Sequence, residues 1–256
     1  MDLQFLQRLR EYELELVLPE FTPGTRVLEI GAGTGWQAKA LAEHGCDVEA
    51  IDLESSGYRA HRVWPVTEYD GRRIPFPDGH FDFIYSSSVL EHIPHLADFQ
   101  QEMRRVLKNT GTAIHIVPAA SWRLWTNLTH YPFVAKYVFG MLAARLGASR
   151  PRSDDIVQLS KHSRWDLLKG ALFPPRHGEI GNALTELYHF SQLRWCRDFE
   201  ASGWRIASHR SNEILYSGYM LFGPRISIDT RRSAARVLGG VCHIYRLEKQ
   251  TLDSTD

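Results

Sequence analysis

Three glycines and one aspartate form the most informative pattern in this chain. Gly31, Gly33 and Gly35 lie in the run VLEIGAGTG at residues 27–35, and Asp52 ends the next apolar run. Glycines let a ligand approach the backbone and allow a tight turn from a strand into a helix. A carboxylate at the end of the following strand can accept hydrogen bonds from ribose hydroxyl groups. The pattern therefore predicts a site for a cofactor that contains adenosine.

The spacing of the glycines indicates which adenosine cofactor the site takes. A dinucleotide site favours glycine at the first, third and sixth positions of the loop, and the sixth position here is Trp36. Glu29, just before the loop, would place a negative charge near the anion site that a diphosphate requires. These features favour S-adenosylmethionine, which carries ammonium and sulfonium groups, over NAD. An NAD-dependent oxidoreductase and a non-catalytic interaction protein that binds S-adenosylmethionine stay open as alternatives.

Alternating strand and helix patterns position this loop. We expect strands at residues 25–30, 46–51, 81–85, 112–117, 204–208 and 241–247, and helices at 3–18, 36–44, 96–107, 190–202 and 229–238. Strands that alternate with helices at this rhythm are typical of βαβ units and a mostly parallel sheet. The chain is therefore predicted to have an α/β fold.

These segments resemble the class I S-adenosylmethionine-dependent methyltransferases. Residues 27–35 with Asp52 are similar to that family's first two motifs, and residues 70–93 (DGRRIPFPDGHFDFIYSSSVLEHI) resemble its small-molecule, type 11-like branch. The turn LKNTGT at 107–112 departs from the family, which usually has Pro-Gly in place of Asn109 and Thr110. The likeness covers about residues 20–118 and, more loosely, 189–248. It implies a Rossmann-like, doubly wound sheet of seven strands, mostly parallel, with a C-terminal antiparallel hairpin.

The resemblance also implies which residues bind the cofactor and its product, S-adenosylhomocysteine. These residues are Glu29, Gly31, Ala32, Gly33, Gly35, Asp52, Leu53, Asp70, Gly71, Ser86 and Ser87. Asp52 would hold the ribose, Leu53 would pack on the adenine, and Asp70 would accept a hydrogen bond from the adenine amino group. Ser86 and Ser87 would lie beside the reacting methyl group. A purely structural turn is the alternative for Asp70.

His92 is the candidate catalytic residue. It follows the fourth expected strand, where sheets of this type open their ligand crevice. An imidazole can accept a proton from a hydroxyl group near neutral pH, so we expect methyl transfer at oxygen rather than at carbon or nitrogen. The alternative is that His92 packs under the cofactor or bonds a carbonyl. Four further histidines lie in or beside residues 119–188 and could reach the same ligand crevice: His130, His162, His177 and His189.

Residues 119–188 interrupt the rhythm after the fifth strand, and we expect a mainly helical lid there. The segment has nine basic and five acidic residues, and it contains Trp122 and Trp125. An aromatic, basic lid suggests an acceptor that is a small or lipid-linked metabolite, for example from a glycan pathway. Residues 131–146 are apolar enough to lie on a membrane surface, and an ordinary helical cap is the alternative. Residues 1–19 are expected to form a cap helix on the cofactor side.

Composition and charge exclude several classes of protein. The 256 residues include 30 Lys+Arg and 30 Asp+Glu, and the zero net charge argues against nucleic-acid binding. Residues 1–20 lack the apolar core of a secretory signal, and no apolar run is long enough to span a membrane. Cys46, Cys196 and Cys242 lie far apart, which argues against structural zinc and a disulfide framework. We expect one domain over residues 1–256 in the cytoplasm, with no metal site.

Overall fold

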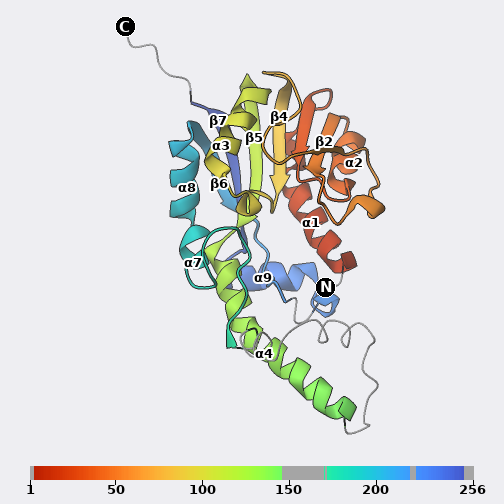
Figure 1. Ribbon diagram of the computed structural model, residues 1–256, viewed down its shortest axis with the longest axis vertical. Helices are drawn as coiled ribbons and strands as arrows, with labels where there is room; N and C mark the ends of the chain where they lie inside the picture. Colours follow the sequence, from red (N-terminus) through yellow and green to blue (C-terminus); the bar gives the residue numbers. More distant parts are fainter. Residues whose placement is uncertain (1–2, 146–169, 171, 220–222, 251–256) are drawn as a thin grey trace.

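The strands of the described residues form one seven-stranded sheet (Figure 1). The computed structural model describes residues 3–145, 170, 172–219 and 223–250. The strands are β1 (Arg26–Ile30), β2 (Asp47–Leu53), β3 (Thr67–Tyr69), β4 (Phe81–Ser87), β5 (Leu107–Pro118), β6 (Trp204–Ser211) and β7 (Cys242–Lys249). Their order is β3-β2-β1-β4-β5-β7-β6, and β7 is antiparallel to both of its neighbours, whereas the other pairs are parallel. The predicted doubly wound sheet with a C-terminal hairpin is confirmed.

Helices cover the sheet and extend beyond one end of it (Figure 1). They are α1 (Leu3–Val17), α2 (Trp36–Glu43), α3 (Leu96–Val106), α4 (Ala120–Arg145), α7 (Glu186–His189), α8 (Gln192–Ala201) and α9 (Ile228–Leu238). Short 3-10 helices are η1 (Leu18–Glu20), η2 (Arg59–His61), η3 (Leu90–His92) and η4 (Gly223–Arg225). In Figure 1, α1, α4 and α9 lie toward the end of the sheet to which β4 points. The carboxyl ends of the parallel strands meet there, which is where such sheets bind ligands.

The structure differs from the expected elements at the amino end of β5. The expected turn at residues 109–111 lies within this strand, which begins directly at Leu107. Leu107 pairs with Phe81 and Thr112 pairs with Phe83, so the residues between them form a bulge. Because Leu107 is fully buried against the core, pairing of its backbone with β4 overrides the turn signal of Asn109 and Gly111. The short strand β3 was not predicted.

The N-terminal helix packs across the carboxyl end of β4. Its apolar side is buried, and its one fully buried acid, Glu13, accepts hydrogen bonds from Asn212 at 2.7 Å and from Tyr216 at 2.8 Å. Arg10 donates to Glu13 at 2.7 Å and lies 3.5 Å from the hydroxyl of Ser87, the last residue of β4. These contacts place α1 beside the end of the sheet where the cofactor is expected.

The segment after β5 is mainly helical where it is described. Helix α4 leaves the sheet and extends away from the body of the molecule (Figure 1), and α7 returns the chain to α8. Much of the predicted lid, 146–169 and 171, lies outside the described residues. Among the helices that are described, none has both the length and the apolar character needed to cross a membrane.

Candidate functional site

The glycine loop is held open by backbone geometry that only glycine adopts easily. Gly31, Gly33 and Gly35 have φ values of +70°, +56° and +77°, in the left-handed region. A Cβ atom on Gly31 would lie 2.4 Å from Cγ2 of Val89, so no side chain fits there unless Val89 moves. The loop therefore runs close to the segment that follows β4.

Asp52 lies beside this loop, as expected. The carbonyl of Ile51 accepts hydrogen bonds from the amides of Gly31 and Ala32 at 2.9 and 3.0 Å, which ties the loop to the end of β2. Asp52 is buried, and its Oδ1 accepts a hydrogen bond from the amide of Leu53 at 2.9 Å. Its Oδ2 has no hydrogen-bond partner among the described residues. A buried carboxylate oxygen without a donor is costly, and a ribose hydroxyl is a donor of the right kind, so the residues fit an adenosyl cofactor.

Glu29 lies under the loop rather than at its surface. It is buried at the end of β1, and its carboxyl group accepts a hydrogen bond from the amide of Ala38 in α2. Burial, with the charge of Asp52 adding to the effect, raises the pKa of Glu29 to about 8. The group is then mostly protonated at pH 7. A neutral Glu29 would not repel a diphosphate, so the sequence-based reason against NAD is weaker than expected. An ammonium group nearby would favour the ionised form of Glu29 again.

The residues expected around the adenine lie together. A Cβ atom on Gly71 would come within 2.7 Å of Cδ2 of Leu53, so the two residues are neighbours. Asp70 is exposed, and its Oδ1 accepts hydrogen bonds from the amides of Arg72 and Arg73 at 2.8 and 3.1 Å, which lowers the pKa of the Asp70 carboxyl group. Asp70 therefore shapes a turn. A pocket of about 320 Å³ next to this turn is lined by Gly71, Arg72, Ile93, Pro94, His95, Asp98 and Phe99.

The two serines at the end of β4 have different surroundings. Ser86 is fully buried, and its hydroxyl lies 2.8 Å from Nδ1 of His115 in β5. The hydroxyl of Ser86 is therefore already paired within the sheet, and its place beside the cofactor stays a prediction. Ser87 is half-buried and contacts Arg10, so it is the more accessible of the two.

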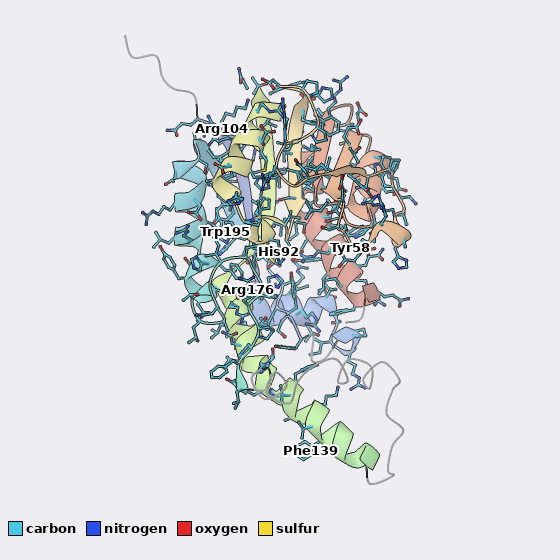
Figure 2. All side chains as sticks on the ribbon, in the orientation of Figure 1. Tyr58, His92, Arg104, Phe139, Arg176 and Trp195 are labelled. Carbon is cyan, nitrogen blue, oxygen red and sulfur yellow. The ribbon has the colours of Figure 1, made fainter. Side chains whose placement is uncertain are left out.

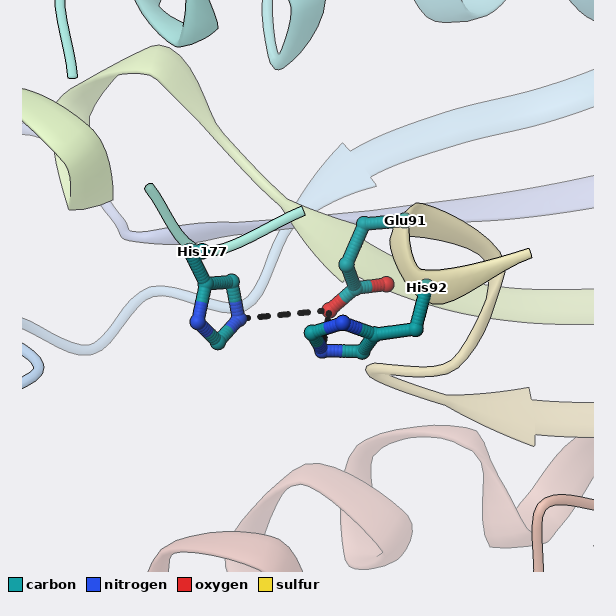
Figure 3. A group of neighbouring side chains, drawn as sticks. All are labelled: Glu91, His92 and His177. Carbon is teal, nitrogen blue, oxygen red and sulfur yellow. Dashed lines mark ion pairs between the residues drawn. The ribbon is translucent and has the colours of Figure 1, made fainter. Parts of the chain in front are cut away.

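His92 belongs to a cluster with Glu91 and His177 (Figure 3). Nε2 of each histidine lies 3.8 Å from Oε1 of Glu91, whose side chain is fully buried. The two imidazole rings meet edge to face at a centroid distance of 4.7 Å. Burial, more than any neighbouring charge, lowers the pKa of His92, so its ring is neutral near pH 7 and offers a lone pair. Figure 2 shows His92 at the end of the sheet.

A buried ion pair holds the loop that carries His177. Nε of Arg123 in α4 lies 3.1 Å from Oε2 of Glu186 in α7, and both side chains are buried. Arg123 also donates to the carbonyl of Pro175 at 2.8 Å. Oε1 of Glu186 accepts hydrogen bonds from the amides of His177 and Gly178 at 2.7 and 2.8 Å. No local sequence pattern marks Arg123 and Glu186 as partners, so only the structure identifies this pair.

Trp122 and His130, two further candidates in the insertion, have structural surroundings. Trp122 is buried and its ring lies 4.4 Å from that of His177, so it packs in the core rather than forming an open stacking platform. His130 is buried and bonds the hydroxyl of Tyr219 at 2.7 Å. His162 lies outside the described residues. Among the described histidines of this segment, His177 is the one whose ring meets that of His92.

Comparisons with known proteins agree on one family. A family model described as a methyltransferase domain matches residues 4–209. An uncharacterized methyltransferase of Mycobacterium sp. (strain KMS) is 32% identical over 202 residues, which cover 67% of this chain and 75% of that protein. A ubiquinone/menaquinone biosynthesis C-methyltransferase of Cupriavidus necator is 36% identical over 112 residues, which cover 40% of this chain. The chain spans about half the length of that relative, 46%.

The fold has counterparts among solved structures. The crystal structure of an S-adenosylmethionine dependent methyltransferase from Mesorhizobium loti superposes with a TM-score of 0.54 at 15% identity, and the match covers 93% of this chain and 98% of the other. At that identity the likeness concerns the fold alone.

Proposed function

This chain belongs to the methyltransferase domain family, and we propose that it transfers the methyl group of S-adenosylmethionine to a hydroxyl group of a small or lipid-linked metabolite. The observation that carries the proposal is the buried Oδ2 of Asp52, which has no partner among the described residues and lies beside the glycine loop. This atom offers the acceptor that a ribose hydroxyl group of an adenosyl cofactor needs.

The proposal assigns the cofactor to residues around the carboxyl ends of β1, β2 and β4. Asp52 holds the ribose, Leu53 and Gly71 flank the adenine, and the turn of Asp70 closes that side. The loop residues Gly31, Ala32, Gly33 and Gly35 and the buried Glu29 face the methionyl end, with Ser87 nearby. When bound, S-adenosylmethionine supplies a methyl group whose bond to a positively charged sulfur breaks as the acceptor oxygen attacks, which leaves S-adenosylhomocysteine.

His92 is the residue that we assign to the acceptor. Its neutral imidazole takes the proton of the acceptor hydroxyl as the new bond to oxygen forms. Support comes from its place at the carboxyl end of β4, in η3, next to Val89, which contacts the glycine loop. The relative named as a C-methyltransferase makes transfer to carbon the alternative outcome of the test.

A lipid-linked acceptor is supported by the surface of α4. Leu128, Tyr131 and Phe139 are exposed, and the helix extends beyond the sheet (Figure 1). We infer that this surface lies against a membrane. Flotation of the protein with liposomes should fall when Phe139 and Tyr131 are both changed to serine, while methyl transfer to a water-soluble acceptor stays unchanged.

Calorimetric titration tests the cofactor. The parent protein and the variant Asp52→Ala are each titrated with S-adenosylmethionine, S-adenosylhomocysteine and NAD. Loss of two hydrogen bonds to a carboxylate, each contributing about 1.5 kcal/mol, should weaken adenosyl-ligand binding by about 100-fold. Asp47→Ala, at the exposed start of the same strand, is the matched control. Binding of NAD alone would overturn the proposal.

A labelled methyl donor tests the atom that is methylated. Acceptors that carry a phenol or alcohol are compared with acceptors whose reactive atom is an activated carbon. His92→Asn should lower the turnover of hydroxyl acceptors by about 100-fold or more. His209→Asn, in β6, is the control. Transfer to carbon that His92→Asn leaves unaffected would contradict methylation at oxygen.

A further inference from the structure

We propose that Glu91, His92 and His177 bind one divalent transition-metal ion of the zinc type. The inference goes beyond the proposed function, because binding of the ion needs neither the methyl donor nor an acceptor. It also departs from the expectation of no metal site, which rested on the spacing of cysteines and not on histidine and carboxylate ligands.

The carboxylate of Glu91 is the first reason. Its side chain is fully buried, and neither Oε1 nor Oε2 has a hydrogen-bond partner in the described part of the chain. The two imidazoles lie 3.8 Å away, which is beyond hydrogen-bond length. A buried carboxylate group that receives no hydrogen bond is strongly disfavoured. A divalent cation at this place would supply the missing partner.

The geometry of the three ligand atoms is the second reason. One atom from each side chain can be chosen so that all lie within 4.8 Å of one another. An ion bound about 2.0–2.2 Å from each atom requires ligands about 3.4 Å apart. Rotation of the two histidine side chains would bring the ligand atoms from the observed separation to the required one. Both side chains have room to rotate, since His92 and His177 are 41% and 35% exposed. Figure 3 shows both histidines turned toward Glu91.

The backbone fixes the two halves of the cluster relative to each other. The amide of Glu179 donates to the carbonyl of Glu91 at 2.9 Å, which joins the loop of His177 to η3. A Cβ atom on Gly178 would lie 2.9 Å from that same carbonyl oxygen, so the close approach depends on glycine. The buried pair of Arg123 and Glu186 holds this loop from the other side. Hydrogen bonds that hold the ligand-bearing segments in place are typical of metal sites in proteins.

The donor set indicates the class of ion. Two imidazole nitrogens and one carboxylate are ligands of zinc and of related transition ions, whereas magnesium prefers oxygen ligands. Three protein ligands leave at least one coordination position open. The lone pair of His92 cannot bind an ion and accept a proton at once. Metal loading and proton removal by His92 are therefore mutually exclusive states of this protein.

Direct metal binding tests the inference. The full-length protein is freed of metal by a chelator and titrated with Zn²⁺ by calorimetry and with Co²⁺ by visible absorption, without a methyl donor. We expect one equivalent of either ion to bind, while Mg²⁺ does not compete. His177→Asn and Glu91→Gln should each weaken binding by more than about 100-fold, since loss of a ligand exceeds the 10–100-fold effect of its supporting residues.

The matched control is His209→Asn, which removes one member of a second histidine pair. Nε2 of His209 lies 2.9 Å from Nδ1 of His243, between β6 and β7. Binding should be unchanged in this variant. Three results would overturn the inference: no saturable binding, binding that survives both cluster variants, or binding that His209→Asn abolishes. Circular dichroism checks that His177→Asn remains folded. Because no methyl donor is present, failure here leaves the proposed methyl transfer standing.

Discussion

The glycine loop and the cluster around Glu91 lie at the same end of the sheet but are built in different ways. The loop and Asp52 come from consecutive elements, β1, α2 and β2, and backbone hydrogen bonds hold them. The cluster joins η3 to a loop near residue 177, and the buried ion pair of Arg123 and Glu186 supports it. One region depends on backbone conformation, and the other depends on buried charge.

The two regions are therefore destabilised by different kinds of substitution. In the loop, a side chain added to a glycine is the damaging change, because the backbone occupies a left-handed conformation. Around Glu186, removal of a partner is the damaging change, because it leaves a charge buried without compensation.

The largest effect is expected for Arg123→Met. This change leaves the buried Glu186 without its cation and removes the hydrogen bond to Pro175. The free energy of unfolding should fall by about 3–5 kcal/mol, measured by urea denaturation. A loss below about 1 kcal/mol would show that the region does not depend on buried charge.

Glu29→Gln should have an effect of opposite sign in the loop region. Glutamate ionises near 4.5 in the unfolded chain, whereas the pKa of Glu29 is about 8 in the folded protein. Between these values the unfolded chain releases a proton that the folded protein keeps, so stability falls as the pH rises. The variant should therefore be more stable than the parent at pH 7, by about 3 kcal/mol, and equal to it at pH 4. Equal stability at both pH values would contradict the raised pKa.

Gly31→Ala should cost about 2–3 kcal/mol of unfolding free energy. The cost combines a left-handed backbone with the contact to Val89. Gly24→Ala separates the two terms, because Gly24 also has a positive φ of +83° but no atom within 4 Å of the added Cβ. We expect that control to lose about 1 kcal/mol. The double variant Gly31→Ala with Val89→Ala lacks the contact to Val89. Its denaturation should therefore show the loss for Gly31→Ala reduced by the difference between Gly31→Ala and Gly24→Ala.

The smallest effect is expected for Arg176→Met. Arg176 lies in the same loop as His177, but its side chain is exposed and sits 3.7 Å from Glu179. An exposed pair contributes no more than about 1 kcal/mol, so the free energy of unfolding should fall far less than for Arg123→Met. A loss as large as that for Arg123→Met would mean that exposure does not separate the two arginines.

Sequence patterns predicted the strands and the turn around the glycine loop well. The strands around Gly31 and the position of Asp52 follow from short-range signals, since a glycine-rich turn and an apolar run need only a few neighbouring residues. The patterns failed where long-range contacts decide. No pattern indicated that the hydroxyl of Ser86 lies 2.8 Å from Nδ1 of His115 in the next strand. The turn at Asn109 became a bulge because Leu107 pairs with Phe81.

Short-range patterns were enough to predict the class of fold and the loop that identifies the family, because strand and turn preferences act over a few residues. Which charged side chains meet follows from the packing of distant segments. His177 and His92 lie far apart in the chain, and neither residue carries a signal for the other. Their approach depends on the burial of Arg123 and Glu186, and burial is a property of the whole packed molecule rather than of any segment.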